Sequence, residues 1–306
     1  MAKVEFGIKV ASFPSDSVNG PPFIEKVFNY IKETGGAFKT IWVSDHLTPW
    51  TAGMPENLDT LECWTALTYL AGAFPDRRFG TAVLSNSFRN PALLAKMVAT
   101  LDELSGGRFI LGIGAGWREY EYLAYGYDFP SPAVRVRQLS EGVQIIRKLW
   151  TEDNVTFNGR YFKVNNLTCY PHPSPCPPIM IGGGGENLTL RVVARYADWW
   201  NTQAALDSYR HKLQVLAEHC DKVGRKFGDI RKTAEAFIAL GETREEAKRR
   251  ALTGRQYHFL GTPEEAVTWL GGFLDLGVDY FEVRFLDEPS TAGARLFAEW
   301  VIPELK

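Results

Sequence analysis

The chain has 306 residues, of which 45% are apolar and 23% charged, as in ordinary soluble globular proteins. Its 34 basic and 36 acidic residues give a net charge of −2, so no basic excess favours binding to nucleic acid or to an anionic membrane. No apolar run approaches the roughly 20 residues of a membrane span, and the first residues lack a signal-peptide cleavage site. Four cysteines without a C-x-x-C pair fit a reducing compartment, so the composition predicts a cytoplasmic protein.

Short apolar runs alternate with helical patterns along the whole chain. Continuous apolar runs are typical of strands buried on both faces, as in parallel sheets. Eight runs are predicted as strands: 4–13, 39–45, 78–87, 108–116, 177–185, 197–203, 233–240 and 278–286. Eight strand–helix units favour a (β/α)8 TIM barrel forming one domain over residues 1–306. A doubly wound sheet is the alternative, but no linker-like stretch divides the chain.

Helix periodicity and helix-capping residues support the same alternation. Residues 23–34 and 91–104 each place apolar side chains on one helix face. Asn90-Pro91 is typical of a helix start, and residues 262–265 combine a Thr N-cap, a first-turn Pro and a Glu at the third position. A further helix is predicted over residues 135–150.

The spacing between predicted strands is uneven in one place. The fourth strand ends near Gly116 and the fifth begins near Pro177. The residues between them, about 117–177, contain the helix 135–150, a hairpin pattern around Asn158-Gly159 and a Pro-rich stretch. We expect this insertion to lie over the C-terminal mouth of the barrel, where active sites lie, either as a lid or as a passive or oligomer-forming appendage.

Several common catalytic motifs are missing from the sequence. There is no G-x-S-x-G, H-E-x-x-H or G-x-x-x-x-G-K-[ST] string, and the five histidines show no metal-ligand spacing, so no metal site is expected. The glycines at 112, 114 and 116 resemble a dinucleotide fingerprint, but the third comes one residue too early. In a barrel, small residues at this strand end would leave room for a planar ring against the backbone.

A run of four glycines, Gly182 to Gly185, follows the fifth predicted strand and precedes a helix predicted from Glu186 to Tyr196. Such a run presents backbone N–H groups and the positive end of the helix dipole to an anion. The run therefore predicts a phosphate-binding segment, with a loose turn as the alternative.

A carboxylate, an imidazole and an indole follow the second predicted strand at Asp45, His46 and Trp50. The C-terminal ends of barrel strands carry catalytic groups, and histidine exchanges protons near neutral pH. We expect these residues at an active site; a histidine that only caps the next element is the alternative.

Several longer stretches carry a family resemblance. They are 41–50 (IWVSDHLTPW), 78–126, 134–162, 177–201 and GTPEEA at 261–266, and they include the strings GIGAGW and IGGGG. The chain resembles the bacterial luciferase-like superfamily of flavin and deazaflavin oxidoreductases, and most of all the branch that uses coenzyme F420. The resemblance implies a TIM barrel with the cofactor ring at the C-terminal ends of the strands.

The resemblance also implies residue roles. It places a non-proline cis peptide bond behind the ring at Ala82–Val83, and it assigns Gly182 to Gly185 to the cofactor phosphate. His46 and Trp50 match the base and the stabiliser of the reduced ring in sugar-phosphate dehydrogenases of this branch, and Asp45 matches a residue at the ring's polar edge. The full set implied for cofactor binding is Asp45, Thr81, Ala82, Val83, Asn86, Ala115, Gly116, Trp117, Ile181, Gly182, Gly183, Gly184 and Gly185.

One position departs from those dehydrogenases. They carry a Glu acid directly after the fourth-strand Gly-x-Gly, where this chain has Trp117. Glu119 and Glu121 lie nearby but are not aligned with that acid. Sugar-phosphate dehydrogenation is therefore not expected, and Arg284 is the candidate for contact with substrate.

The resemblance leads to one expected function and two alternatives. We expect an F420-dependent oxidoreductase that transfers a hydride between the deazaflavin and a small organic substrate, in a homodimer as is common in the family. The first alternative is an FMN-dependent monooxygenase that uses reduced flavin and oxygen. The second is a non-catalytic flavin or deazaflavin carrier, against which Asp45, His46 and Trp50 argue.

Overall fold

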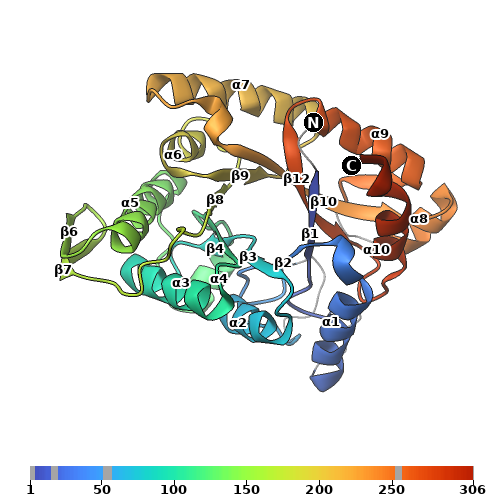
Figure 1. Ribbon diagram of the computed structural model, residues 1–306, viewed down its shortest axis with the longest axis horizontal. Helices are drawn as coiled ribbons and strands as arrows, with labels where there is room; N and C mark the ends of the chain where they lie inside the picture. Colours follow the sequence, from blue (N-terminus) through green and yellow to red (C-terminus); the bar gives the residue numbers. More distant parts are fainter. Residues whose placement is uncertain (1–3, 15–19, 51–56, 252–256, 306) are drawn as a thin grey trace. The chain divides into compact units, whose positions relative to one another are not determined.

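The computed structural model describes residues 4–14, 20–50, 57–251 and 257–305 (Figure 1). The strands in this part of the chain are β1 Glu5–Lys9, β2 Thr40–Val43, β3 Arg78–Thr81, β4 Leu84–Ser85, β5 Phe109–Gly114, β6 Val155–Asn158, β7 Lys163–Leu167, β8 Ile179–Gly182, β9 Trp199–Thr202, β10 Arg231–Leu240, β11 Phe259–Gly261 and β12 Val278–Phe285. Among these described residues, no helix is long and apolar enough to cross a membrane.

The α-helices alternate with the strands. They are α1 Pro21–Glu33, α2 Cys63–Ala73, α3 Pro91–Ser105, α4 Glu119–Ala124, α5 Pro132–Thr151, α6 Thr189–Tyr196, α7 Leu206–Lys222, α8 Arg244–Arg250, α9 Pro263–Leu274 and α10 Ala292–Leu296. Helix starts follow the predicted signals: Asn90 accepts bonds from the backbone N–H groups of Ala92 and Leu93, and Thr262 and Glu265 form a capping box.

The chain has the predicted (β/α)8 TIM-barrel fold. Each of the eight apolar runs supplies one of its parallel strands, namely β1, β2, β3, β5, β8, β9, β10 and β12. The insertion also lies where it was expected, between β5 and β8, and consists of α4, α5 and the hairpin β6–β7.

The chain contains two compact units, which are described separately. Unit 1 comprises Met1–Glu62, Asn201–His211 and Arg231–Lys306, and unit 2 comprises Cys63–Trp200 and Lys212–Ile230. The sequence-based prediction that residues 1–306 form a single domain therefore remains a prediction.

Unit 1 has a parallel sheet in the order β11-β10-β12-β1-β2. Its outer face is apolar: Phe6 and Phe281 stack there, and Phe297, from the helical segment after α10, meets Phe6 edge to face. The opposite face carries polar residues, because side chains alternate along a strand. The register sets Glu282 of β12 opposite Gly7 of β1 on one side and Glu235 of β10 on the other.

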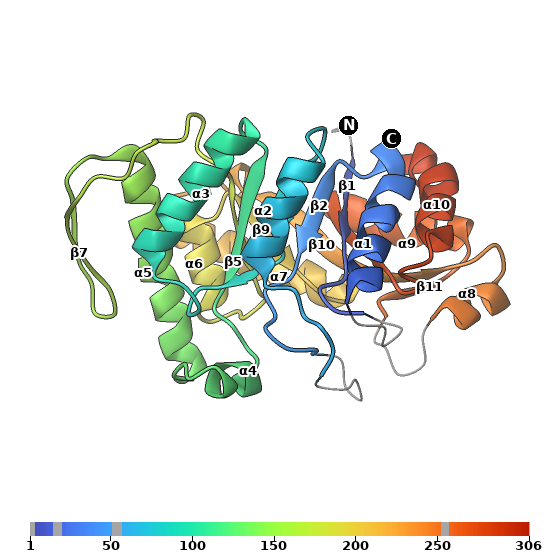
Figure 2. The same cartoon turned by 90° about the horizontal axis from the view of Figure 1, so that it is seen from below.

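Unit 2 is built around β5, which pairs with β3, β4 and β8. The predicted strand 78–87 is divided into β3 and β4 by a cis peptide bond at Ala82–Val83, the bond for which the cis form was predicted. Figure 2 shows the β6–β7 hairpin beside α5. The Glu141 carboxylate of α5 accepts bonds from the hairpin-turn N–H groups of Arg160, Tyr161 and Phe162.

The start of α6 was predicted wrongly. The helix begins at Thr189 rather than Glu186, because residues 186–188 form a separate turn. The Leu190 N–H donates back to the Gly185 carbonyl at 3.0 Å. The glycine run therefore precedes a turn and not the helix itself.

Candidate active site

The glycines of β5 and β8 are required by close packing inside unit 2. A Cβ at Gly112 would overlap the Thr81 carbonyl oxygen, and a Cβ at either Gly114 or Gly182 would lie 2.9 Å from a Val83 methyl group. The Thr81 hydroxyl also donates to the Gly112 carbonyl at 2.7 Å and accepts from its N–H at 3.0 Å. These glycines thus allow the backbone of the Thr81–Val83 bulge to lie directly on two neighbouring strands.

The sequence-based explanation for this glycine spacing was incomplete. Protein atoms occupy the space beside Gly112, Gly114 and Gly116: at Gly116 a Cβ would overlap the Tyr122 hydroxyl, and its φ of 75° also favours glycine. Room for a planar ligand is therefore not needed to explain these three glycines.

A Gly112→Ala variant tests this packing. We expect a loss of about 1–3 kcal/mol in the free energy of unfolding, since the added methyl group meets backbone that cannot rotate away. Gly72→Ala in α2 is the matched control, because nothing lies within 4 Å of its added Cβ, and it should be neutral or stabilising. Urea unfolding measures both; equal effects would contradict the packing role of Gly112.

The Gly182–Gly185 segment has two carbonyl groups that bind side chains, and this fixes the direction of the N–H groups that follow them. The Gly183 carbonyl accepts a bond from the Trp200 indole at 2.9 Å, and the Gly184 carbonyl accepts one from the Lys212 ammonium at 2.8 Å. In a planar trans peptide the following N–H points opposite to the carbonyl. The N–H groups of Gly184 and Gly185 therefore point away from Trp200 and Lys212, as an anion-binding segment requires.

Two side chains of α7 steady the turn after the glycines. Lys212 lies 3.3 Å from the Glu186 carboxylate, and the His219 ring nitrogen lies 2.9 Å from the Glu186 carbonyl oxygen. Lys212 adds a positive charge beside the glycine segment that the sequence analysis had not identified. Lys212 lies on α7, about 30 residues after the glycine segment, so the spacing of residues in the sequence does not indicate that the two are neighbours.

The other residues predicted in unit 2 differ in accessibility. Asn86 is buried, and within the described part of the chain its Nδ2 atom has no hydrogen-bond partner. Ile181 is fully buried, Ala115 is half-buried, and the Trp117 side chain is 63% exposed. Asn86 and Trp117 therefore retain groups that can contact a ligand, whereas Ile181 supports the strand.

In unit 1, Trp50 is the centre of a group of rings and charges. Its ring centroid lies 5.4 Å from that of His46, 6.1 Å from Phe13 and 6.4 Å from Phe237. The Trp50 indole nitrogen is buried and has no hydrogen-bond partner among the described residues. The structure thus brings the predicted His46 and Trp50 together, with Asp45 buried directly before them in the chain.

Arg284 belongs to the same group. Its guanidinium carbon lies 5.8 Å from the Trp50 ring centroid, while its Nε lies 3.9 Å from the Glu288 carboxylate and makes no hydrogen bond with any residue that the structure describes. A buried donor without a hydrogen bond is costly, so this side chain is well suited to donate a hydrogen bond to a ligand oxygen. The sequence-based candidate for substrate contact therefore lies against the predicted catalytic residues.

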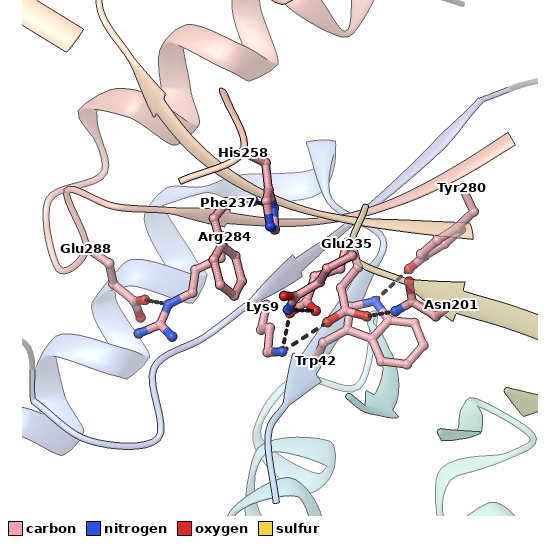
Figure 3. A network of polar contacts seen from close by, with 11 residues as sticks. Lys9, Trp42, Asn201, Glu235, Phe237, His258, Tyr280, Arg284 and Glu288 are labelled. Atoms are coloured by element: carbon pink, nitrogen blue, oxygen red, sulfur yellow. Dashed lines mark hydrogen bonds and ion pairs between the residues drawn. The ribbon is translucent and has the colours of Figure 1, made fainter. Parts of the chain in front are cut away.

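Several polar residues of unit 1 were missed by the sequence analysis (Figure 3). The Lys9 ammonium contacts Glu235 and lies 3.5 Å from Glu282, and Asn201 donates to Glu282 at 2.8 Å. A charged residue inside an otherwise apolar strand, as in GIKVA, TAEAF and YFEVR, is the signal that could have found them.

His258 is also a residue that the sequence analysis did not single out. Its Nδ1 accepts a hydrogen bond from the Phe237 N–H at 3.0 Å, and the two rings stack with centroids 5.0 Å apart. Burial lowers the pKa of His258 below its usual value, and the Glu235 carboxylate opposes this only in part. The ring is therefore neutral at neutral pH, with its proton on Nε2.

Curated relatives carry names that refer to F420. The chain is 28% identical over 309 residues to an F420-dependent glucose-6-phosphate dehydrogenase of Amycolatopsis mediterranei, covering 87% of this chain and 90% of that protein. It is 34% identical over 250 residues to the enzyme of that name from Segniliparus rotundus, covering 74% and 70%. A third such relative, from Kineococcus radiotolerans, is 34% identical over 207 residues, which span only 60% of its length.

Solved structures support the fold. The structure of an F420-dependent secondary alcohol dehydrogenase in complex with an F420–acetone adduct superimposes with a TM-score of 0.83 at 21% identity, covering 99% of both chains. The coenzyme F420-dependent tetrahydromethanopterin reductase of Methanopyrus kandleri gives 0.76 at 18% identity, covering all of both chains. The family model described as luciferase-like monooxygenase matches residues 28–280. The chain therefore belongs to the luciferase-like monooxygenase family.

Proposed function

We propose that this protein is an F420-dependent oxidoreductase that transfers a hydride between the deazaflavin and a small organic substrate. The observation that carries the proposal is the Gly182–Gly185 segment, whose N–H groups and neighbouring Lys212 suit an anionic cofactor tail. The names of the relatives, which cover most of this chain, favour F420 over FMN for that cofactor. The word monooxygenase in the family description does not by itself require chemistry with oxygen.

The residues of unit 2 are assigned to the cofactor. Gly184 and Gly185 would bind the phosphate through their N–H groups, and Lys212 would add favourable potential. The buried Asn86 amide, whose Nδ2 has no partner among the residues described, would donate to a polar atom of the ligand. Thr81, Ala82, Val83, Ala115, Gly116, Trp117 and Ile181 complete the proposed set.

The residues of unit 1 are assigned to substrate and proton. F420, when bound, supplies a ring carbon that accepts or donates hydride in a two-electron step. His46 takes the hydroxyl proton of an alcohol as hydride leaves its carbon, or returns it in the reverse direction. Trp50 covers the imidazole on one side, Asp45 orients it, and Arg284 binds a substrate oxygen.

A titration of the purified protein tests the choice of cofactor. We expect F420 to bind with about micromolar affinity, near −8 kcal/mol, and FMN to bind much more weakly. A Lys212→Met variant should weaken F420 binding, since it removes the charge next to the glycine segment. Tight FMN binding without F420 binding would instead support the flavin monooxygenase.

The cellular setting is proposed from the composition and the assembly from the family resemblance. We propose a cytoplasmic homodimer whose ligands are the deazaflavin and a small molecule. Sedimentation of the purified protein would give its assembly directly, and a single monomeric species at micromolar concentration would contradict the dimer.

A further inference from the structure

Three charged side chains lie buried together on the inner sheet face of unit 1 (Figure 3). Lys9, Glu235 and Glu282 come from β1, β10 and β12, and their side chains are 6%, 10% and 1% exposed. Lys9 contacts the Glu235 carboxylate directly and the Glu282 carboxylate at 3.5 Å. We call these three residues the buried triad.

The triad has one cation for two carboxylates. Glu235 and Glu282 are directly opposite one another in the β10–β12 register, where like charges are unfavourable. If all three groups were ionised, an unbalanced negative charge would be buried, at a cost of several kcal/mol. A proton bound to one carboxylate makes the triad neutral.

The electrostatic surroundings indicate which carboxylate holds the proton. Burial raises the pKa of Glu282 to about 8, and the opposing effects of Lys9 and Asn201 are too small to cancel this. Burial disfavours the charged form of Lys9, but Glu235 and Glu282 outweigh it and raise its pKa. At neutral pH Glu282 is therefore the carboxylate that holds the proton, while Lys9 is charged.

Two amide side chains of β9 and the residues after it support the carboxylates. Asn201 Nδ2 donates to Glu282 at 2.8 Å, and Gln203 contacts Glu235 through its own amide nitrogen. The Asn201 side-chain Oδ1 atom is buried and finds no hydrogen-bond partner in residues 4–14, 20–50, 57–251 and 257–305. Because an amide exchanges donor and acceptor by a half-turn, Asn201 can bind Glu282 whether it is ionised or protonated.

The triad lies next to the residues proposed to bind substrate. Phe237 and Arg284 follow Glu235 and Glu282 by two positions, so they share the same sheet face. The Lys9 ammonium lies 5.9 Å from the Phe237 ring, and Arg284 lies over Trp50. Further titratable neighbours in the described part of the chain are His258, which stacks on Phe237, and Tyr280, on the same face of β12. Glu288 lies 3.9 Å from the Arg284 Nε, and the His46 ring packs against Trp50.

We propose that the buried triad is a proton-binding site that positions Arg284: the proton on Glu282 keeps the sheet face next to Arg284 neutral and leaves its guanidinium available to substrate. This role rests on the proposed function of Arg284. When Glu282 ionises, its proton passes to solvent and the new negative charge attracts the guanidinium away from Trp50. Glu282 is thus a positioning residue, which needs no contact with substrate.

Unfolding in urea tests the bound proton without cofactor or substrate. The folded protein holds this proton more tightly than the unfolded chain, because the pKa of Glu282 is about 8 in the fold and 4.5 in the unfolded chain. The free energy of unfolding should therefore fall as the pH rises from 4.5 towards 8. The folding equilibrium constant should decrease by up to about tenfold per pH unit in this range. Glu282→Gln mimics the neutral acid and should remove this decline. Tyr280→Phe, buried on the same strand, is the control and should keep it. Parallel pH profiles for wild type and Glu282→Gln would overturn the proposal.

The positioning of Arg284 is tested by the indole NMR signal of Trp50, assigned through its loss in Trp50→Phe. We expect this signal to show a transition with a midpoint near pH 8 in wild type and in Tyr280→Phe, and this transition to be missing in Glu282→Gln; any change caused by the neighbouring His46 is common to all three proteins. A Trp50 signal that does not titrate in wild type, or titrates equally in Glu282→Gln, would refute the positioning role. Neither measurement requires F420, so a failure of the proposed function would appear separately, as absent F420 binding.

Discussion

Replacement of His46 by alanine should reduce the rate of hydride transfer by about 10²–10⁴-fold, the usual contribution of a positioned acid–base group. His46 packs against Trp50 and follows the buried Asp45, so its loss removes the proton acceptor while the cofactor-binding residues of unit 2 are unchanged. Stopped-flow reduction of F420 measures the rate, and a separate titration measures cofactor affinity.

His211→Ala is the control, because this histidine is exposed on α7. The control should keep both the rate and the affinity of wild type. If His46→Ala retained full activity, another group would have to carry the proton. If it lost affinity and rate in equal measure, His46 would be a binding residue instead of a base.

Lys9→Met should destabilise the protein by about 3–5 kcal/mol, as is typical when one member of a buried ion pair is removed. The variant leaves Glu235 and Glu282 opposite one another without a cation. The methionine fills most of the lysine volume, so the loss reports charge more than packing. Urea unfolding at pH 7 gives its size.

Lys148→Met, the same substitution at a surface ion pair, is the control for Lys9→Met. Lys148 pairs with Glu152 at 3.0 Å with both side chains largely exposed, and such pairs contribute about 0–1 kcal/mol. Adding Glu282→Gln to Lys9→Met should not deepen the loss, because Glu282 already carries a proton at pH 7. A loss of less than 1 kcal/mol for Lys9→Met would show that the triad is not an electrostatic unit.

The strands and most helices could be predicted because each has a local signal. Continuous apolar runs identified the eight barrel strands, and Asn90 and Thr262 identified two helix starts. The three-residue strand β11 has too short a pattern to be recognised. The late start of α6 depends on a turn at residues 186–188, whose conformation is set by Lys212 and His219 from another helix.

The candidate site could be predicted only in part. Asp45, His46 and Trp50 lie close together in sequence after a strand, so they could be found together. Lys9, Glu235 and Glu282 lie more than 200 residues apart at their extremes, and only strand register brings them together. The family resemblance assigned no role to these three residues. Each of them is a charged residue within an otherwise apolar strand pattern, and this feature of the sequence could have identified them.

The central claim is tested most directly by anaerobic incubation of the protein with oxidised F420 and a panel of small alcohols deuterated at the carbinol carbon. We predict that at least one alcohol is oxidised to its carbonyl compound while the deuterium appears on the reduced deazaflavin in equal amount. Turnover that instead requires reduced FMN and consumes oxygen, with no deuterium transfer to F420, would contradict the account.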